Sequence, residues 1–153
     1  MSDELLFADL KVIDMSSWIA APVAATILAD FGAQVIKVEP PVAGDGYRNF
    51  AMMPSSPTSD DTYTWEMDNR NKRSIALDLK NEKGREIALQ LIQSADIVLE
   101  NFRPGTMAKL GLDYDSLKST HPRLIYCSLK GFLSGPYENR VALDEVTQMM
   151  GGL

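Results

Sequence analysis

Two short strand patterns near the N-terminus flank one helix pattern, and this unit constrains the fold more than any other feature of the sequence. The strand patterns are LKVIDMS at 10–16 and QVIKVE at 34–39. Between them, APVAATILADFG at 21–32 places Ala, Leu and Ile at helical spacing, with Pro22 near the helix start and Gly32 closing its end. Because parallel strands need a crossover connection, the unit predicts a parallel pair with the helix on one face.

The remaining sequence continues this alternation of strands and helices. Further strands are expected at 74–79, 96–102 and 124–132, and further helices at 81–95, 104–111, 113–122 and from 142 onward. The stretch 40–61 is rich in Pro, Ser, Gly and Asp without a sustained period, which predicts a long surface loop of the kind that often carries function. The whole pattern predicts an α/β fold with a Rossmann-like, mostly parallel sheet and helices on both faces.

Charge and composition argue against several classes of protein. A chain of 153 residues is long enough for one domain, and its net charge of -6 argues against general nucleic-acid binding, because phosphate backbones favour a basic surface. Cys127 is the single cysteine, so no intrachain disulfide is possible. The N-terminal segment lacks a signal-peptide pattern, and no apolar run approaches the roughly 20 residues that span a bilayer. We therefore expect a cytoplasmic protein without nucleic-acid or membrane partners.

The residues that follow each strand form the candidate site, because ligands of a doubly wound sheet bind beyond the carboxyl ends of its strands. These residues lie at 16–22, 40–48, 80, 101–105 and 130–135. The first segment, SSWIAAP, lacks the G-x-G-x-x-G fingerprint, which argues against a nicotinamide-dependent dehydrogenase. No His or Cys spacing is typical of a metal site, and no G-x-S-x-G or Cys–His pattern indicates a Ser or Cys nucleophile.

Polar residues in and near these segments allow both structural and functional interpretations. Ser16 and Ser17 either cap the helix that follows or face a bound phosphate. Basic residues surround one strand pattern in an otherwise acidic chain, namely Arg70, Lys72, Arg73 and Lys80. They form either a solvated basic loop or an anion site. Residue chemistry alone thus indicates an α/β domain with a candidate anion site.

Five collinear segments together resemble the N-terminal part of the family III CoA-transferases, which include formyl-CoA transferase, carnitine CoA-transferase and α-methylacyl-CoA racemase. The segments are VIDMSSWIAAPVAATILADFGAQVIKVEPPVAGDGYR, NRNKRSIALDLK, ADIVLENFRPGTMAKLGLDYDSL, PRLIYCSLKGF and GPYENRVALDEVTQMMGGL. The resemblance spans residues 8–153. It implies that residues 1–153 are the N-terminal CoA-binding part of the large Rossmann-like domain, that the small domain and the C-terminal part are absent, and that the full-length protein is an interlocked homodimer.

The resemblance also implies an acyl-CoA:carboxylate CoA-transferase, which moves CoA between carboxylic acids through an aspartyl-CoA intermediate. The nucleophilic aspartate is expected beyond Leu153, so the fragment itself is expected to be inactive. Asp144 matches an acidic active-site position and either supports the reaction or serves as an N-cap or first-turn acid of a helix. Racemases of the family carry a histidine where this chain has Leu143, which favours a transferase. The alternatives are a racemase-like enzyme of the same family and a non-catalytic fragment.

The resemblance further implies a CoA or acyl-CoA site, with a small carboxylic acid as second substrate and no metal. The residues at matching positions are Ser17, Trp18, Ala20, Leu77, Lys80, Asn101, Phe102, Arg103, Lys109 and Leu110. The first three line the CoA channel, Leu77 and Lys80 flank its adenosine end, and the others complete the cofactor wall. Cations and backbone donors in this set suit the CoA phosphates, and apolar members suit the adenine.

Three positions depart from the family pattern. Pro40 and Lys109 stand where several members have arginine, and a lysine offers no bidentate fork. Ile19 replaces a polar residue of formyl-CoA transferase, which argues against a formate- or oxalate-type substrate. The loop 40–48 is expected to help frame the CoA and acyl site, with Arg48 either available for a carboxylate or phosphate or tied to Asp45.

Overall fold

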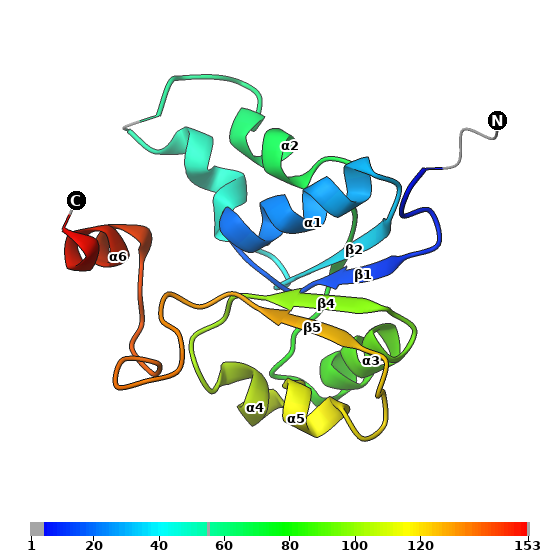
Figure 1. Ribbon diagram of the computed structural model, residues 1–153. Coiled ribbons are helices and arrows are strands. Elements are labelled where there is room, and N and C mark those ends of the chain that lie inside the picture. The colour runs from blue at the N-terminus through cyan, green and yellow to red at the C-terminus, as the bar shows by residue number, and fades with distance from the viewer. Residues whose placement is uncertain (1–4, 55, 153) are drawn as a thin grey trace.

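The computed structural model describes residues 5–54 and 56–152, and a five-stranded parallel sheet runs through its centre. The strands are β1 (Lys11–Asp14), β2 (Gln34–Glu39), β3 (Arg73–Ala76), β4 (Ile97–Glu100) and β5 (Ile125–Ser128). Their order is β3-β2-β1-β4-β5, and all neighbouring pairs are parallel. The chain changes direction across the sheet at β1, so the carboxyl ends of β1 and β4 form the topological switch point where such sheets bind ligands (Figure 1).

Helices cover both faces of this sheet. The described helices are α1 (Ala20–Asp30), α2 (Tyr63–Asn69), α3 (Glu82–Gln93), α4 (Thr106–Leu110), α5 (Tyr114–Leu117) and α6 (Asp144–Gly151), of which α6 lies away from the sheet (Figure 1). In Figure 1, α1 and α2 lie on one side of the sheet, and α3, α4 and α5 lie on the other. The predicted Rossmann-like α/β fold is therefore confirmed. Across 5–54 and 56–152, none of the helices combines the length and the apolar character needed to cross a membrane.

The core consists of two apolar clusters, one on each face of the sheet. Val12 belongs to the cluster under α1, and its neighbour Ile13 belongs to the cluster on the α3 side, as the alternating side chains of a strand require. Small residues of α1, Ala25 and Ala29, allow that helix to approach the sheet closely. Because both faces are covered, the central strands β1 and β4 are mostly buried and carry consecutive apolar residues, which is typical of parallel sheets, whereas the edge strands β3 and β5 are more exposed.

Four of the predicted strands extend beyond the observed ones, and the excess at the carboxyl end is largest for 74–79 and 124–132. The predicted strand 74–79 ends early because Asp78 accepts a hydrogen bond from the backbone N–H of Lys80 (2.9 Å) and turns the chain toward α3. Asn81 then caps α3 by accepting from the N–H of Lys83 (3.0 Å). The predicted strand 124–132 ends at Ser128 because the partner strand β4 ends in register with it.

The predicted surface loop 40–61 contains a short helical segment that the sequence pattern did not reveal. This is η1, a 3₁₀ helix over Gly46–Met52, which Asp45 begins by accepting a hydrogen bond from the N–H of Tyr47 (3.0 Å). Helix α2 follows and was also not predicted. Both elements are short, so neither repeats an apolar period often enough to stand out in the sequence.

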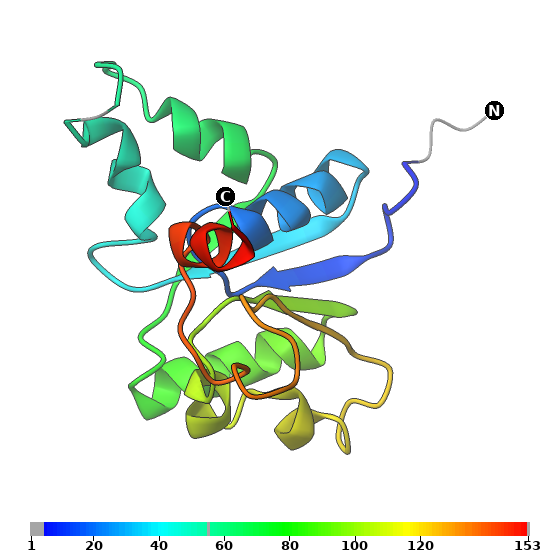
Figure 2. The same ribbon diagram turned by 60° about the vertical axis from the view of Figure 1, so that its left-hand side comes forward.

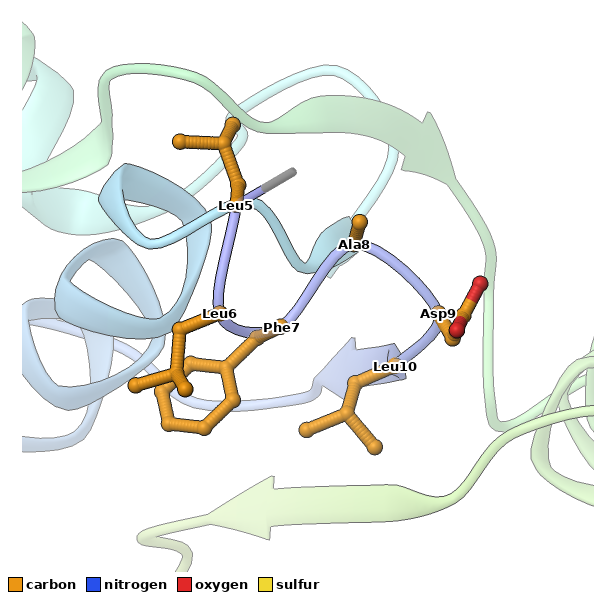
Figure 3. Close-up of a pocket in the computed structure, with 6 residues that line it drawn as sticks. All are labelled: Leu5, Leu6, Phe7, Ala8, Asp9 and Leu10. Atoms are coloured by element: carbon orange, nitrogen blue, oxygen red, sulfur yellow. The ribbon is translucent and has the colours of Figure 1, made fainter. Parts of the chain in front are cut away.

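The segment Leu5–Leu10 precedes β1 and lines a hollow at the amino ends of the strands (Figure 3). Phe7 packs edge-on against Phe31 just after α1, with ring centroids 6.0 Å apart. The residues that line this hollow include none of the predicted site residues. It is therefore separate from the carboxyl edge of the sheet, where the candidate site lies.

Candidate functional site

Charged side chains form a buried ionic cluster at the carboxyl ends of β1 and β2. Its members are Asp14, Lys37, Asp45 and Lys72, and each side chain is at most 2% exposed. Lys37 Nζ lies 3.0 Å from Asp45 Oδ2 and 3.6 Å from Asp14 Oδ2. Lys72 Nζ lies 2.9 Å from Asp14 Oδ2. Because two carboxylates face two ammonium groups, the cluster is neutral as a unit, which is the condition under which buried charges are tolerated.

Lys72 reaches this cluster from the loop before β3, and its ammonium group is surrounded by protein acceptors. Its ammonium also donates hydrogen bonds to the Pro22 carbonyl (2.7 Å) and to Asn69 Oδ1 (2.9 Å). Burial lowers the pKa of Lys72 from its ordinary value, and the charge of Asp14 opposes that shift. Neither the solvated-loop nor the anion-site interpretation of the basic residues therefore describes Lys72.

The ionic cluster fixes the backbone that leaves β1. Asp14 Oδ1 accepts hydrogen bonds from the N–H of Ser16 (3.0 Å) and from its hydroxyl. Lys37 Nζ donates to the Ser16 carbonyl (2.8 Å). The capping interpretation of the two serines is wrong, because α1 begins only at Ala20, after Ile19, and has no side-chain cap.

Asn101 joins the two loops at the topological switch point. Its Oδ1 accepts a hydrogen bond from the N–H of Ser17 (2.9 Å), and its Nδ2 donates to the Ser17 carbonyl (2.7 Å). The side-chain amide of Asn101, just after β4, thus binds both the backbone N–H and the carbonyl of Ser17 in the loop after β1. The structure therefore brings together two of the residues predicted to bind CoA, although they are 84 positions apart in sequence.

Glu39 and Arg48 form a second ion pair at the end of β2. Arg48 Nε and Nη2 donate to Glu39 Oε2 and Oε1, each at 2.7 Å, and the guanidinium carbon lies 3.8 Å from the ring centroid of Trp65. Burial acts to raise the pKa of Glu39, but hydrogen bonds from Arg48 and Ser74 outweigh it and hold that pKa at about 2. The guanidinium of Arg48 is therefore already paired with the carboxylate of Glu39, the last residue of β2.

The expected tie between Arg48 and Asp45 is made by backbone groups only. The Arg48 N–H donates to the Asp45 carbonyl (3.0 Å), whereas the Asp45 carboxylate is occupied by Lys37. A hollow of about 250 Å³ lies beside the Glu39–Arg48 pair. Its lining residues are Glu39, Pro40, Val42, Ala43, Gly44, Arg48, Ser74 and Ala76. The loop that follows β2 thus frames an open space at the carboxyl edge of the sheet.

Glu100, the last residue of β4, organises the third loop of the site. Lys130 Nζ lies 2.9 Å from Glu100 Oε1 and also donates to the Phe102 carbonyl (2.7 Å). Glu100 Oε2 accepts a hydrogen bond from the Phe102 N–H (2.8 Å). The backbone around Phe102 is therefore held from both sides by charge-assisted hydrogen bonds, which are stronger than neutral ones.

The remaining residues predicted to bind CoA differ in their exposure. Leu77 is buried, and Phe102 and Leu110 are half-buried against the core on the α3 side. The cations Lys80, Arg103 and Lys109 are exposed, and none of them makes an ion pair with any residue in 5–54 or 56–152. Such cations are available for an external anion.

Asp144 belongs to α6, the red helix near the C-terminus in Figures 1 and 2. It is the first residue of that helix and follows the N-cap Leu143, so it is a first-turn acid and not an N-cap. Its side chain accepts a hydrogen bond from Gln148 within the same helix. Every described residue of α6 is exposed, so the position of Asp144 depends on few tertiary contacts.

Sequence reasoning did not single out Lys37, and it assigned neither Asp45 nor Lys72 to a buried ionic cluster. A partial signal was present, because Lys37 interrupts an otherwise apolar strand and an unpaired charge is not tolerated there. The identity of its partners was not available, since Asp14 and Asp45 come from other segments of the chain.

Known proteins share both the sequence and the fold. A family model for CoA-transferase family III matches residues 7–153. The succinyl-CoA–L-malate CoA-transferase beta subunit of Chloroflexus aurantiacus is 42% identical over 151 residues, which cover 97% of this chain and 36% of that protein. A formyl-CoA:oxalate CoA-transferase of Rhodopseudomonas palustris is 41% identical over 143 residues, which cover 94% of this chain and 33% of that protein.

A solved structure agrees with these relatives. The crystal structure of a CAIB/BAIF family protein from Brucella suis is similar to this chain with a TM-score of 0.87 and 41% identity, over 98% of this chain and 40% of that one. The chain thus spans about a third of the length of the curated relatives it matches.

Proposed function

This chain belongs to CoA-transferase family III, and we propose that it is the N-terminal, CoA-binding part of the large domain of an acyl-CoA:carboxylate CoA-transferase. The proposal is supported by relatives named as CoA-transferases at 41 to 42% identity. The substrates are an acyl-CoA and a small carboxylic acid. The complete enzyme is proposed to be a cytoplasmic, interlocked homodimer.

The observation that carries the proposal is a set of exposed cations beyond the carboxyl ends of β3 and β4, in the loops after these strands and in α4. The chain has a net charge of -6, yet Lys80, Arg103 and Lys109 follow the carboxyl ends of strands and make no ion pair among the residues described. CoA carries a 3′-phosphate and a pyrophosphate, and these groups need cations that are not already neutralised. The three side chains supply that charge.

The loops after β1 and β4 provide the second part of the proposed CoA site. Ser17 and Asn101 are locked to one another by two hydrogen bonds, so the backbone between the phosphate-binding cations and the switch point is fixed before CoA arrives. A preorganised wall reduces the entropy that is lost on binding. Phe102, which is half-buried, adds apolar surface for the adenosine or pantetheine portion of CoA, and the buried Leu77 supports this wall from the core.

The covalent chemistry is proposed to depend on a carboxylate outside residues 1–153. That carboxylate attacks the thioester carbon of the acyl-CoA, the carbon–sulfur bond breaks, and a mixed anhydride and CoA thiolate form. The thiolate then attacks the enzyme's carbonyl and releases the first acid, and the acceptor carboxylate takes CoA by the reverse sequence. The role of the present residues is to bind and orient CoA through both half-reactions.

Calorimetric titration with CoA tests the proposed site. Lys80→Ala and Arg103→Ala should each weaken binding by about 1 to 3 kcal/mol, the range for hydrogen bonds to charged groups. Lys118→Ala is the matched control, because Lys118 lies before β5, at the amino ends of the strands, and pairs with Asp115. Unchanged affinity in both site variants would contradict the assignment.

An activity assay tests the assignment of chemistry to another part of the enzyme. Residues 1–153 alone should transfer no CoA between any acyl donor and carboxylate acceptor, whereas a longer protein that carries them should do so. Turnover by residues 1–153 above the uncatalysed background would show that the reactive carboxylate lies within this chain.

A further inference from the structure

Trp18 has an unusual backbone conformation for a large residue. Its φ is 67°, in the left-handed region, and the described chain contains only two other non-glycine residues with positive φ, Val42 and Asn71. A bulky side chain is disfavoured in this region because its Cβ crowds the neighbouring carbonyl. A conformation of this kind persists only where surrounding contacts fix it, and such positions cluster at functional sites.

Asp45 supplies the contact that fixes Trp18. Its Oδ1 accepts hydrogen bonds from the N–H of Trp18 (3.1 Å) and from the N–H of Tyr47 (3.0 Å). The carboxylate is only 1% exposed, so these bonds form away from competing water. One oxygen atom therefore joins the loop after β1 to the start of η1.

Lys37 holds the carboxylate of Asp45 in place. Its Nζ lies 3.0 Å from Asp45 Oδ2, on the oxygen that does not bind the backbone, and also donates to the Ser16 carbonyl (2.8 Å). The same ammonium group thus contacts both the chain just before Trp18 and the acid that binds Trp18. These two contacts hold the loop in place, and they thereby stabilise the left-handed backbone conformation at Trp18.

The indole of Trp18 lies over Gly46 and remains half exposed. A Cβ at position 46 would lie 3.2 Å from Trp18 Cζ2, so a glycine there gives the ring room to lie close to the backbone of η1. The ring is 49% exposed at the switch-point edge of the sheet, beside the Ser17–Asn101 pair. The ring of Tyr47 lies 6.4 Å from that of Trp18, centroid to centroid, so the position of Trp18 is set by Asp45, Gly46 and Tyr47 while half of the residue stays exposed.

We infer that Asp45 is a positioning residue, which with Lys37 as its counter-ion holds Trp18 in the left-handed conformation and thereby sets the shape of the CoA-binding loop after β1. Its effect on CoA rests on the function proposed above. The contacts of Asp45 with Trp18 and Lys37, called the clamp below, do not depend on that function, because they are present in the unliganded protein. The two parts are therefore tested by different measurements.

Tryptophan fluorescence tests the clamp without any ligand. The chain has two tryptophans, so Trp65→Phe leaves Trp18 as the single emitter. In that background, Asp45→Ala should lower the fluorescence anisotropy of Trp18 and increase its quenching by acrylamide, because the loop loses its anchor. Asp30→Ala is the matched control. Asp30 is the last residue of α1, and its carboxylate pairs with Arg70 and not with the loop after β1. Unchanged anisotropy and quenching in a folded Asp45→Ala protein would overturn the inference.

Substitution of Trp18 tests the backbone conformation even if Asp45→Ala fails to fold. Trp18→Gly and Trp18→Ala both remove the indole, but only glycine adopts a positive φ freely. Trp18→Gly should therefore unfold at a temperature about 2 to 4 °C above that of Trp18→Ala. Equal or reversed midpoints would show that residue 18 is not held left-handed in solution.

Titration with CoA tests the functional part. Asp45→Ala should raise the CoA dissociation constant about tenfold, as expected when a charge-assisted contact that orders the site is lost. If the unsubstituted protein binds CoA and the folded variant binds equally well, Asp45 does not position the site. If neither protein binds CoA but Trp18 loosens, the proposed function fails while the clamp remains.

Discussion

The ionic cluster at the ends of β1 and β2 and the segment 131–152 after β5 are held in opposite ways. In the cluster, Asp14 and Lys37 are at most 1% exposed, and each contacts groups from other segments of the chain. In the segment 131–152, no side chain is buried, and α6 lies away from the sheet (Figure 1). Both regions follow strands at the same edge, yet only the first is fixed by the tertiary contacts of residues 5–54 and 56–152.

The difference indicates which part of the proposed site is preorganised. Loops at the switch point are locked through buried charges and the Ser17–Asn101 pair, so they have one arrangement before any ligand binds. Asp144 instead depends on the internal hydrogen bonds of a short helix, and isolated helices of that length are marginal in water. The loops of the proposed CoA site are therefore held by tertiary contacts within this chain, whereas the surroundings of Asp144 are not.

The largest effect is expected from breaking the buried cluster. Lys37→Met removes the ammonium and leaves Asp14 and Asp45 with only Lys72 as counter-ion, which should lower the free energy of unfolding by about 3 to 5 kcal/mol. Lys118→Met, which breaks the exposed pair with Asp115, should cost far less, because solvent screens the charges of an exposed pair. Urea unfolding of both variants checks the contrast, and similar losses would show that burial does not distinguish the two pairs.

A smaller effect is expected from titrating the pair at the end of β2. The pKa of Glu39 falls from 4.5 to about 2 in the folded protein, so its ionised form contributes stability above pH 4.5, and this contribution is lost as the pH falls toward 2. Because the side chain of Arg48 is 38% exposed and screened by solvent, we expect a contribution of about 2 kcal/mol.

The comparison of the unsubstituted protein with Glu39→Gln isolates this contribution. The difference in their free energies of unfolding should be largest near neutral pH and should narrow as the pH is lowered through the stated range. A difference that stays constant with pH would mean that Glu39 keeps its ordinary pKa in the folded protein. The charge of Glu39 would then not stabilise the loop after β2.

The smallest effect is expected at the start of α6. Asp144→Ala should change the free energy of unfolding by less than about 0.5 kcal/mol, because exposed substitutions away from tertiary contacts have little effect. Asn81→Ala provides the contrast at another helix start, since Asn81 caps the packed helix α3 and its loss should cost about 1 kcal/mol. If Asp144→Ala were the more destabilising of the two, α6 would have tertiary contacts comparable to those of α3.

Sequence patterns predicted the sheet and its two-sided cover because these depend on local periodicity. The unit around β1 and β2 was recognisable from its two strands, the intervening helix and the terminal Gly32, and the register of Val12 with Val35 confirms it. Short elements such as η1 and α2 were not predicted, because a few residues do not establish a period. The resemblance to a family placed Ser17 and Asn101 in one site, but only the structure gave the hydrogen bonds between them.

The sequence by itself determined the alternation of strands and helices, the parallel sheet and the family, because each is encoded in residues that are close in the chain or in motifs in fixed order. Only the tertiary structure decided which charges neutralise one another. Lys37 required the partners Asp14 and Asp45, and Arg48 selected Glu39 instead of its expected neighbour Asp45. The physical reason is that a buried charge needs an opposite charge within a few ångströms, and chain folding, not sequence distance, brings that partner there.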